Sequence, residues 1–187
     1  IASYDYDDGR GNMYTEMMIV SSAGAPSEGY SLTGTGSMNS ERIGGIAHIA
    51  SGASATAFAI VGRGAYDNNA VTGGGTGIDG FAIFLDQQKA FTGSLVLYKA
   101  SSYEESLNAV AAGGDCFFLA GYEESMTGIN AVVAKASATG AVIWAKDLGD
   151  MAMDERLFGI AALPDGGFVA VGRKGTSSSA GGEAWVF

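Results

Sequence analysis

The residues of this chain that could carry out chemistry are few and lie far apart. The densest acidic cluster spans residues 5–9, where Asp5, Asp7 and Asp8 precede Gly9. Calcium loops combine oxygen ligands at alternating positions with a glycine at the sharp turn, so these three aspartates are candidate calcium ligands. The EF-hand pattern is not met, because Gly9 stands where a third ligand is expected. A solvated acidic loop is the alternative interpretation.

The other reactive side chains do not form a catalytic set. His48 is the single histidine, and no Cys, Asp or Glu lies within five residues of it, so we interpret it as a strand histidine. Cys116, the single cysteine, stands among apolar residues and is expected to be buried. There is no Gly-x-Ser-x-Gly elbow, and the glycine run 73–77 lacks the lysine of a phosphate loop. We therefore predict a protein that is not an enzyme and has no cofactor, apart from possible calcium.

Charge and composition exclude several partners. Ten Lys and Arg against 20 Asp and Glu give a net charge of -10, which disfavours binding to nucleic acid. No apolar run reaches the length of about 18 to 20 residues that spans a bilayer. Only 16% of the residues are charged, and Ser, Thr, Asn and Gly supply the polarity, so we expect an extracellular or cell-surface location.

The elements that would position these residues are short and repeated. Three anchor segments resemble one another, and each is followed by an apolar block that ends in glycine, at Gly62, Gly121 and Gly172. The anchors are Glu41-Arg42-Ile43-Gly44-Gly45-Ile46, Glu105-Ser106-Leu107-Asn108-Ala109-Val110 and Glu155-Arg156-Leu157-Phe158-Gly159-Ile160. With two further blocks before each anchor, the chain divides into units at 14–78, 79–129 and 130–182, and a further unit starts at 183–187.

Each unit contains four short apolar blocks, which predict an all-β protein. The blocks are rich in Val, Ile, Phe and Tyr and are bounded by Gly, Ser, Asn and Asp, which indicates strands. Asp165-Gly166 predicts a tight hairpin, and the 30 glycines against 2 prolines suit many turns. A helical turn is plausible only at residues 102–107 and 150–157. Four antiparallel strands repeated every 40 to 50 residues or so are typical of a β-propeller blade.

The unit 130–182 resembles a known class of repeat. Residues 130–144, with a Thr139-Gly140 turn before Trp144, and residues 163–172, with an Asp-Gly-Gly hairpin, are similar to bacterial-type β-propeller repeats. The stretch from Ala134 to Trp144 also resembles the tryptophan-docking motif of quinoprotein propellers, although Ala136 replaces its aspartate. The resemblance implies that Trp144 packs between blades and that Gly140 forms a turn. Three units and one strand do not complete a ring, so we expect a fragment of a larger propeller or pairing of open edges with another chain.

Function is expected in the loops rather than in a catalytic centre. Tyr66, Tyr103 and Tyr122 stand in or beside predicted loops, where aromatic residues with acidic neighbours could bind a protein or a carbohydrate. The leading hypothesis is a structural or protein-interaction β-propeller module in an extracellular or filamentous assembly, with a protein partner or further copies of itself. One alternative is a fragment of a carbohydrate-active or quinoprotein-like enzyme, and another is a calcium-stabilised adhesion module.

Overall fold

The chain is built from β-strands. The computed structural model describes residues 2–7, 13–20, 23, 25–31, 38–49, 56–66, 78–86, 88, 90–97, 103–150, 153–176 and 182–187. The strands are β1 (Ala2–Asp7), β2 (Met13–Val20), β3 (Pro26–Ser31), β4 (Met38–His48), β5 (Thr56–Tyr66), β6 (Ile78–Asp86), β7 (Phe91–Leu97), β8 (Glu105–Gly113), β9 (Cys116–Glu124), β10 (Ile129–Ser137), β11 (Val142–Leu148), β12 (Asp154–Ala162), β13 (Phe168–Gly175) and β14 (Glu183–Val186). The predicted all-β class is confirmed, and the described parts of the two stretches that allowed a helical turn belong to loops, β8 and β12 instead.

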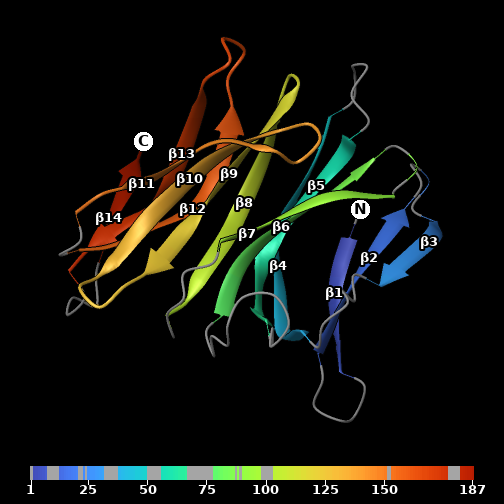
Figure 1. The fold of residues 1–187 in the computed structure, drawn as a ribbon, viewed down its shortest axis with the longest axis horizontal. Coiled ribbons are helices and arrows are strands. Elements are labelled where there is room, and N and C mark those ends of the chain that lie inside the picture. Colours follow the sequence, from blue (N-terminus) through green and yellow to red (C-terminus); the bar gives the residue numbers. More distant parts are fainter. Residues whose placement is uncertain are drawn as a thin grey trace.

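The strands form four layers that follow one another along the chain (Figure 1). The first layer is β1-β2-β3 and the second is β4-β5-β6-β7. The third layer, β8-β9-β10-β11, and the fourth, β12-β13-β14, are joined into one sheet by a parallel pairing of β10 with β12 at Ile129 and Asp154. All other neighbouring strands are antiparallel. None of the described sheets closes on itself.

The second, third and fourth layers each begin with the strand that contains an anchor segment. The sequence units 14–78, 79–129 and 130–182 each begin two strands earlier, so each contains the last two strands of one layer and the first two strands of the next. The first strands of successive layers, β4, β8 and β12, lie side by side. This arrangement brings equivalent positions of the three anchors together.

A β-bulge interrupts each anchor strand at the same place, and a glycine stands opposite it. The pairing shifts by one residue after Ile43 in β4, after Leu107 in β8 and after Leu157 in β12. The residues opposite are the three repeated glycines, Gly62, Gly121 and Gly172. A Cβ atom on any of these glycines would collide with a carbonyl oxygen of the bulged strand. The repeated glycine is therefore explained by close backbone approach at a bulge.

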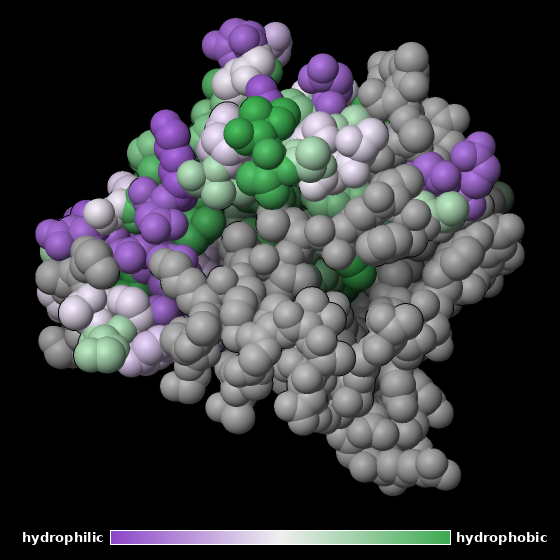
Figure 2. Space-filling view, viewed as in Figure 1, coloured by the Kyte–Doolittle hydropathy of each residue, from purple (hydrophilic) through white to green (hydrophobic). Residues whose placement is uncertain are grey.

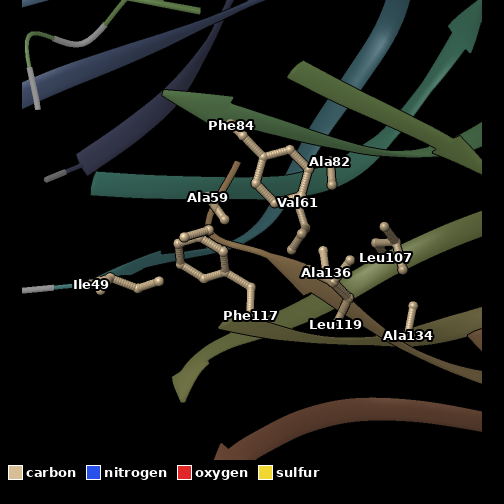
Figure 3. Close-up of a cluster of buried hydrophobic side chains, with 11 residues drawn as sticks. Ile49, Ala59, Val61, Ala82, Phe84, Leu107, Phe117, Leu119, Ala134 and Ala136 are labelled. Atoms are coloured by element: carbon tan, nitrogen blue, oxygen red, sulfur yellow. The ribbon is translucent and has the colours of Figure 1, made fainter. Parts of the chain in front are cut away.

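The main hydrophobic core lies between the second and third layers (Figure 3). Phe84 of β6 faces Phe117 of β9, with ring centroids 5.8 Å apart. Each ring is fully buried, which stabilises the fold by about 1.5–3 kcal/mol. The surrounding positions hold small side chains such as Ala59, Ala82 and Ala134, and these let the two layers approach closely.

A second cluster joins the third and fourth layers. Leu157 and Ala170 of the fourth layer pack with Ala120, Ala131 and Val133 of the third. Hydrophobic side chains also reach the surface: Figure 2 shows them gathered in the upper centre of the face in view, where β11 crosses in front of its neighbours in Figure 1. Within the described ranges, no helix has the length and apolar character needed to cross a membrane.

Candidate functional site

A cleft of about 460 Å³ opens where the bulged ends of β4, β8 and β12 meet β5, β9 and β13. Among the described residues that line it, every charged side chain is an arginine. The chain has five arginines, and four of them are at this cleft. Its lining consists of Arg42, Ile43, Gly44, Arg63, Ser106, Leu107, Asn108, Tyr122, Arg156, Phe158 and Arg173.

The polar lining comes from equivalent positions of the three repeats. Arg42, Ser106 and Arg156 each follow the glutamate of an anchor, whereas Arg63, Tyr122 and Arg173 each follow the repeated glycine. The register pairs these residues directly across neighbouring strands, with Arg42 opposite Arg63, Ser106 opposite Tyr122, and Arg156 opposite Arg173. The repeat thus places three cross-strand pairs at one level, with an arginine pair on each side of the central Ser-Tyr pair.

Tyr122 is the centre of a hydrogen-bond network in this cleft. Its hydroxyl group donates a hydrogen bond to Glu104, and Arg63 Nη1 donates to the same carboxylate. Arg63 Nη1 also lies 3.2 Å from the Tyr122 hydroxyl oxygen. The guanidinium group of Arg156 stacks 4.4 Å from the centroid of the Tyr122 ring. Burial, followed by the hydrogen bond to Glu104, raises the pKa of Tyr122, so the phenol stays protonated at neutral pH.

Two carboxylates hold three of the arginines in place. Asp154 accepts hydrogen bonds from Arg156 Nε at 2.9 Å and from Arg173 Nη2. Glu104 binds Arg63. Arg42 is exposed and forms no ion pair with any residue that the structure describes. Because a guanidinium group has five N–H donors, the arginines keep donors available for a ligand.

Polar side chains also tie the third layer to the fourth beneath the cleft. The Ser106 hydroxyl donates to Asn108 Oδ1 at 2.8 Å, and Asn108 Nδ2 donates to the Leu157 carbonyl oxygen at 2.7 Å. These hydrogen bonds fix the floor of the cleft. Its chemistry is that of an oxyanion-binding surface, since arginine matches carboxylate and phosphate oxygens.

A buried pair of carboxyl groups lies behind the cleft. Asp79 lies near the beginning of β6, and Glu105 is the first residue of β8. Burial raises the pKa of Asp79 above its usual value of 3.8, and the interaction with Glu105 partly opposes the shift. The equivalent position in the next unit is Asn130, which is buried, whereas Glu183 is exposed on β14. The second and third layers therefore form this pair of carboxyl groups, and the equivalent positions Asn130 and Glu183 do not repeat it.

The candidate calcium ligands are not all within the described residues. Asp5 and Asp7 belong to β1, where they are paired with Thr15 and Met13, rather than to a loop. Asp8 lies outside the described residues. The described side chains form no group of three or more His, Cys, Asp or Glu suited to a metal ion.

The three tyrosines singled out from the sequence occupy different settings. Tyr122 lies inside β9 rather than in a loop, and the residue is buried. The residues beside Tyr122 are polar, which is typical of a loop, but Tyr122 takes part in a hydrogen-bond network in the interior. Tyr103 is half-buried in a bend before β8, and Tyr66 ends β5. The structure does not bring these residues together as one aromatic surface.

The repeat residues of the Trp-containing unit take up turn and packing positions. Trp144 is half-buried, and its ring lies 6.5 Å from that of Phe118 in the third layer and 6.2 Å from that of Phe168 in the fourth layer. Gly140 has a φ of 89° in the turn before β11. Asp165 Oδ1 accepts a hydrogen bond from the Gly167 amide in the β12–β13 hairpin, where Gly166 has a φ of 88°. Positive φ values of this kind favour glycine.

The single histidine and the single cysteine are not part of the cleft. His48 is exposed at the end of β4 and stacks on Phe58, with ring centroids 4.7 Å apart. Cys116 is buried, and its Sγ donates to the Gly113 carbonyl oxygen at 2.9 Å. Burial is the main cause of its raised pKa.

The arginine cleft was not identified from the sequence. The signal was present, because an arginine follows the anchor glutamate in two units and the repeated glycine in two units. An alignment of the units position by position would have placed them together. Comparison with known proteins adds no assignment, since no protein-family model matches the chain and no curated protein sequence was found to be similar to it.

Proposed function

We propose that this chain is a non-enzymatic β-propeller module that acts as a structural or protein-interaction element. Two four-stranded antiparallel sheets that follow one another, with their first strands adjacent, support the proposal. Its interaction surface is the outer face of the fourth layer, and its partner is a layer of a second copy. An extracellular or cell-surface location is part of the proposal and rests on the composition.

The observation that carries the proposal is a pattern of burial shared by successive layers. In the second layer, the cross-strand pair Val61 and Ala82 is fully buried against the third layer. In the third layer, the equivalent pair Ala120 and Val133 is buried against the fourth layer. Each layer therefore presents the same two positions to the layer that follows it.

In the fourth layer, the equivalent pair is Val171 and Val186, and both are exposed. They pair directly across β13 and β14, with 45% and 69% of their surface accessible. Phe158 of β12 is also exposed, at 54%, and adds to the exposed apolar surface of the fourth layer. A face that repeats the character of two covered faces is suited to a further layer of the same kind.

The edge of β14 adds a second means of attachment. Among the described strands, β14 pairs with β13 alone, and the third layer shows a fourth strand, β11, in the corresponding place. An open edge offers unpaired N–H and C=O groups to an incoming strand. Packing on the valine face and pairing along the edge would act together on one partner layer.

Sedimentation velocity of the purified chain over a range of concentrations tests the proposal. We expect the average mass to rise above the monomer mass of 18.9 kDa as the concentration increases. The double variant Val171→Ser and Val186→Ser should shift association to higher concentration, because it removes apolar surface from the contact. Met126→Ser is the matched control, since Met126 is 84% exposed in the turn between β9 and β10.

The outcomes separate clearly. A chain that stays monomeric at every concentration overturns the proposal, as does a valine variant that associates like the wild type. Equal weakening by Met126→Ser would also overturn it, because the effect would then be general to exposed hydrophobic residues.

A further inference from the structure

One cleft is rich in arginine, although the chain as a whole is acidic. The net charge is -10, and the chain has only five arginines. Four of them line one cleft, and none of the described residues that line it carries a carboxylate. Composition alone does not account for this distribution, so the cleft requires an explanation of its own.

The cross-strand geometry makes this arrangement costly in the absence of an anion. Arg42 lies directly opposite Arg63, and Arg156 lies directly opposite Arg173. Like charges at directly opposed positions of antiparallel strands destabilise the pairing. One arginine in each cross-strand pair would be enough for a structural role, but each pair contains two arginines.

The nearby carboxylates balance only part of this charge. Glu104 pairs with Arg63, and Asp154 pairs with both Arg156 and Arg173. Two negative charges therefore face four positive charges, and two positive charges remain uncompensated among these groups. The carboxylates lie outside the lining and orient the guanidinium groups, which leaves the arginines as the charged groups that a ligand would meet.

We propose that this cleft binds a small organic anion with two negatively charged oxyanion groups, either phosphate or carboxylate. The Arg42–Arg63 pair receives one group and the Arg156–Arg173 pair receives the other, with Tyr122 between them. Guanidinium groups bind such oxygens through two parallel N–H···O hydrogen bonds. The volume of about 460 Å³ suits a small molecule, and the exposed ring of Phe158 provides an apolar wall. This inference does not depend on the proposed self-association.

Isothermal titration calorimetry of the whole chain with two probes tests the inference. Citrate represents carboxylate ligands and pyrophosphate represents phosphate ligands, and NaCl keeps the ionic strength equal in all titrations so that screening is constant. We expect saturable binding of at least one probe with a single site per chain. Binding of citrate alone identifies a carboxylate ligand, and binding of pyrophosphate alone identifies a phosphate ligand.

Three variants place the binding in the cleft. Arg42→Gln is decisive, because its exposed side chain has no ion pair with the described residues and its loss should leave the fold intact. Arg42→Gln and Arg173→Gln should each weaken binding by about tenfold or more, since each removes a charge-assisted contact. Lys146→Gln, on the exposed strand β11, removes the same charge away from the cleft and should leave binding unchanged.

Several results would overturn the inference. They are the absence of saturable binding for both probes, unchanged affinity in Arg42→Gln and Arg173→Gln, or an equal loss in Lys146→Gln. Circular dichroism of each variant confirms that it is folded before its affinity is compared with that of the wild type.

Discussion

Replacement of Gly121 by alanine tests the structural basis of the repeat. A Cβ atom at this position would collide with the carbonyl oxygen of Ser106, which would have to retreat by about 1 Å or more. Strand β8 has little room for this movement. A Cβ on Gly44 would already be only 2.5 Å from the Leu107 carbonyl oxygen, and a Cβ on Gly80 would be 3.2 Å from the Leu107 nitrogen. The neighbouring layer therefore holds β8 from its other side.

The size of the effect follows from this confinement. Overpacking of a well-packed interior usually costs about 1–3 kcal/mol, and we expect Gly121→Ala to lie at the upper end, about 3 kcal/mol, because backbone rather than a flexible side chain must move. In a chain of 187 residues, this corresponds to a decrease in melting temperature of about 6–12 °C. Gly172 faces the Arg156 carbonyl oxygen in the same way, but the outer face of its layer is exposed, so Gly172→Ala should cost less.

Urea unfolding followed by tryptophan fluorescence measures these differences. Gly114→Ala is the matched control, because a Cβ there would have no atom within 4 Å and only the positive φ of 68° opposes alanine. That conformation costs about 1–2 kcal/mol for an L-residue. We expect the loss of stability to decrease from Gly121→Ala through Gly172→Ala to Gly114→Ala. The explanation would be refuted if Gly121→Ala were no less stable than Gly114→Ala.

Three further changes probe the interior. Asp79→Asn should stabilise the chain at neutral pH, because burial raises the pKa of Asp79 and wild-type stability therefore falls as the pH rises from the usual 3.8 through the raised value. Melting temperatures measured against pH should show that the advantage of Asp79→Asn over the wild type grows across this range, and a constant difference would contradict the explanation. Leu119→Ala removes a fully buried side chain and should lower the free energy of unfolding by about 2–5 kcal/mol in urea titrations; a loss below 1 kcal/mol would contradict the described core. Cys116 should react slowly with a chromogenic disulfide reagent in the native chain and rapidly in urea, and equal rates would show that its thiol is accessible.

The strands and turns could be predicted because their signals are local. The hairpin at Asp165-Gly166 is observed where the sequence predicted it, closed by the hydrogen bond from the Leu163 amide to the Gly167 carbonyl oxygen. Short apolar blocks between glycines indicated strands wherever the blocks could be compared with the structure. The sequence could not show which strand of the repeat begins each layer, because a repeat has the same period wherever its boundary is drawn. Only strand pairing shows that the second, third and fourth layers begin with the strands that contain the anchors.

The cleft depends on contacts between residues far apart in the sequence. Tyr122 of β9 and Arg156 of β12 meet because these two strands contact each other. No local pattern encodes this meeting. Arg63, which contacts the Tyr122 hydroxyl group from the second layer, is 59 residues away in the sequence.

The parallel pairing of β10 with β12 has a consequence for how the molecule opens. It makes seven strands, β8 to β14, one hydrogen-bonded sheet, whereas the first and second layers are separate sheets. Segments that share a hydrogen-bond network tend to open as one cooperative unit. Amide protons of β8 to β13 should therefore exchange with solvent through a common opening event, and the Ile129 amide, bonded to the Met153 carbonyl oxygen, should report on it. The amides of β1 to β3 should exchange independently of it.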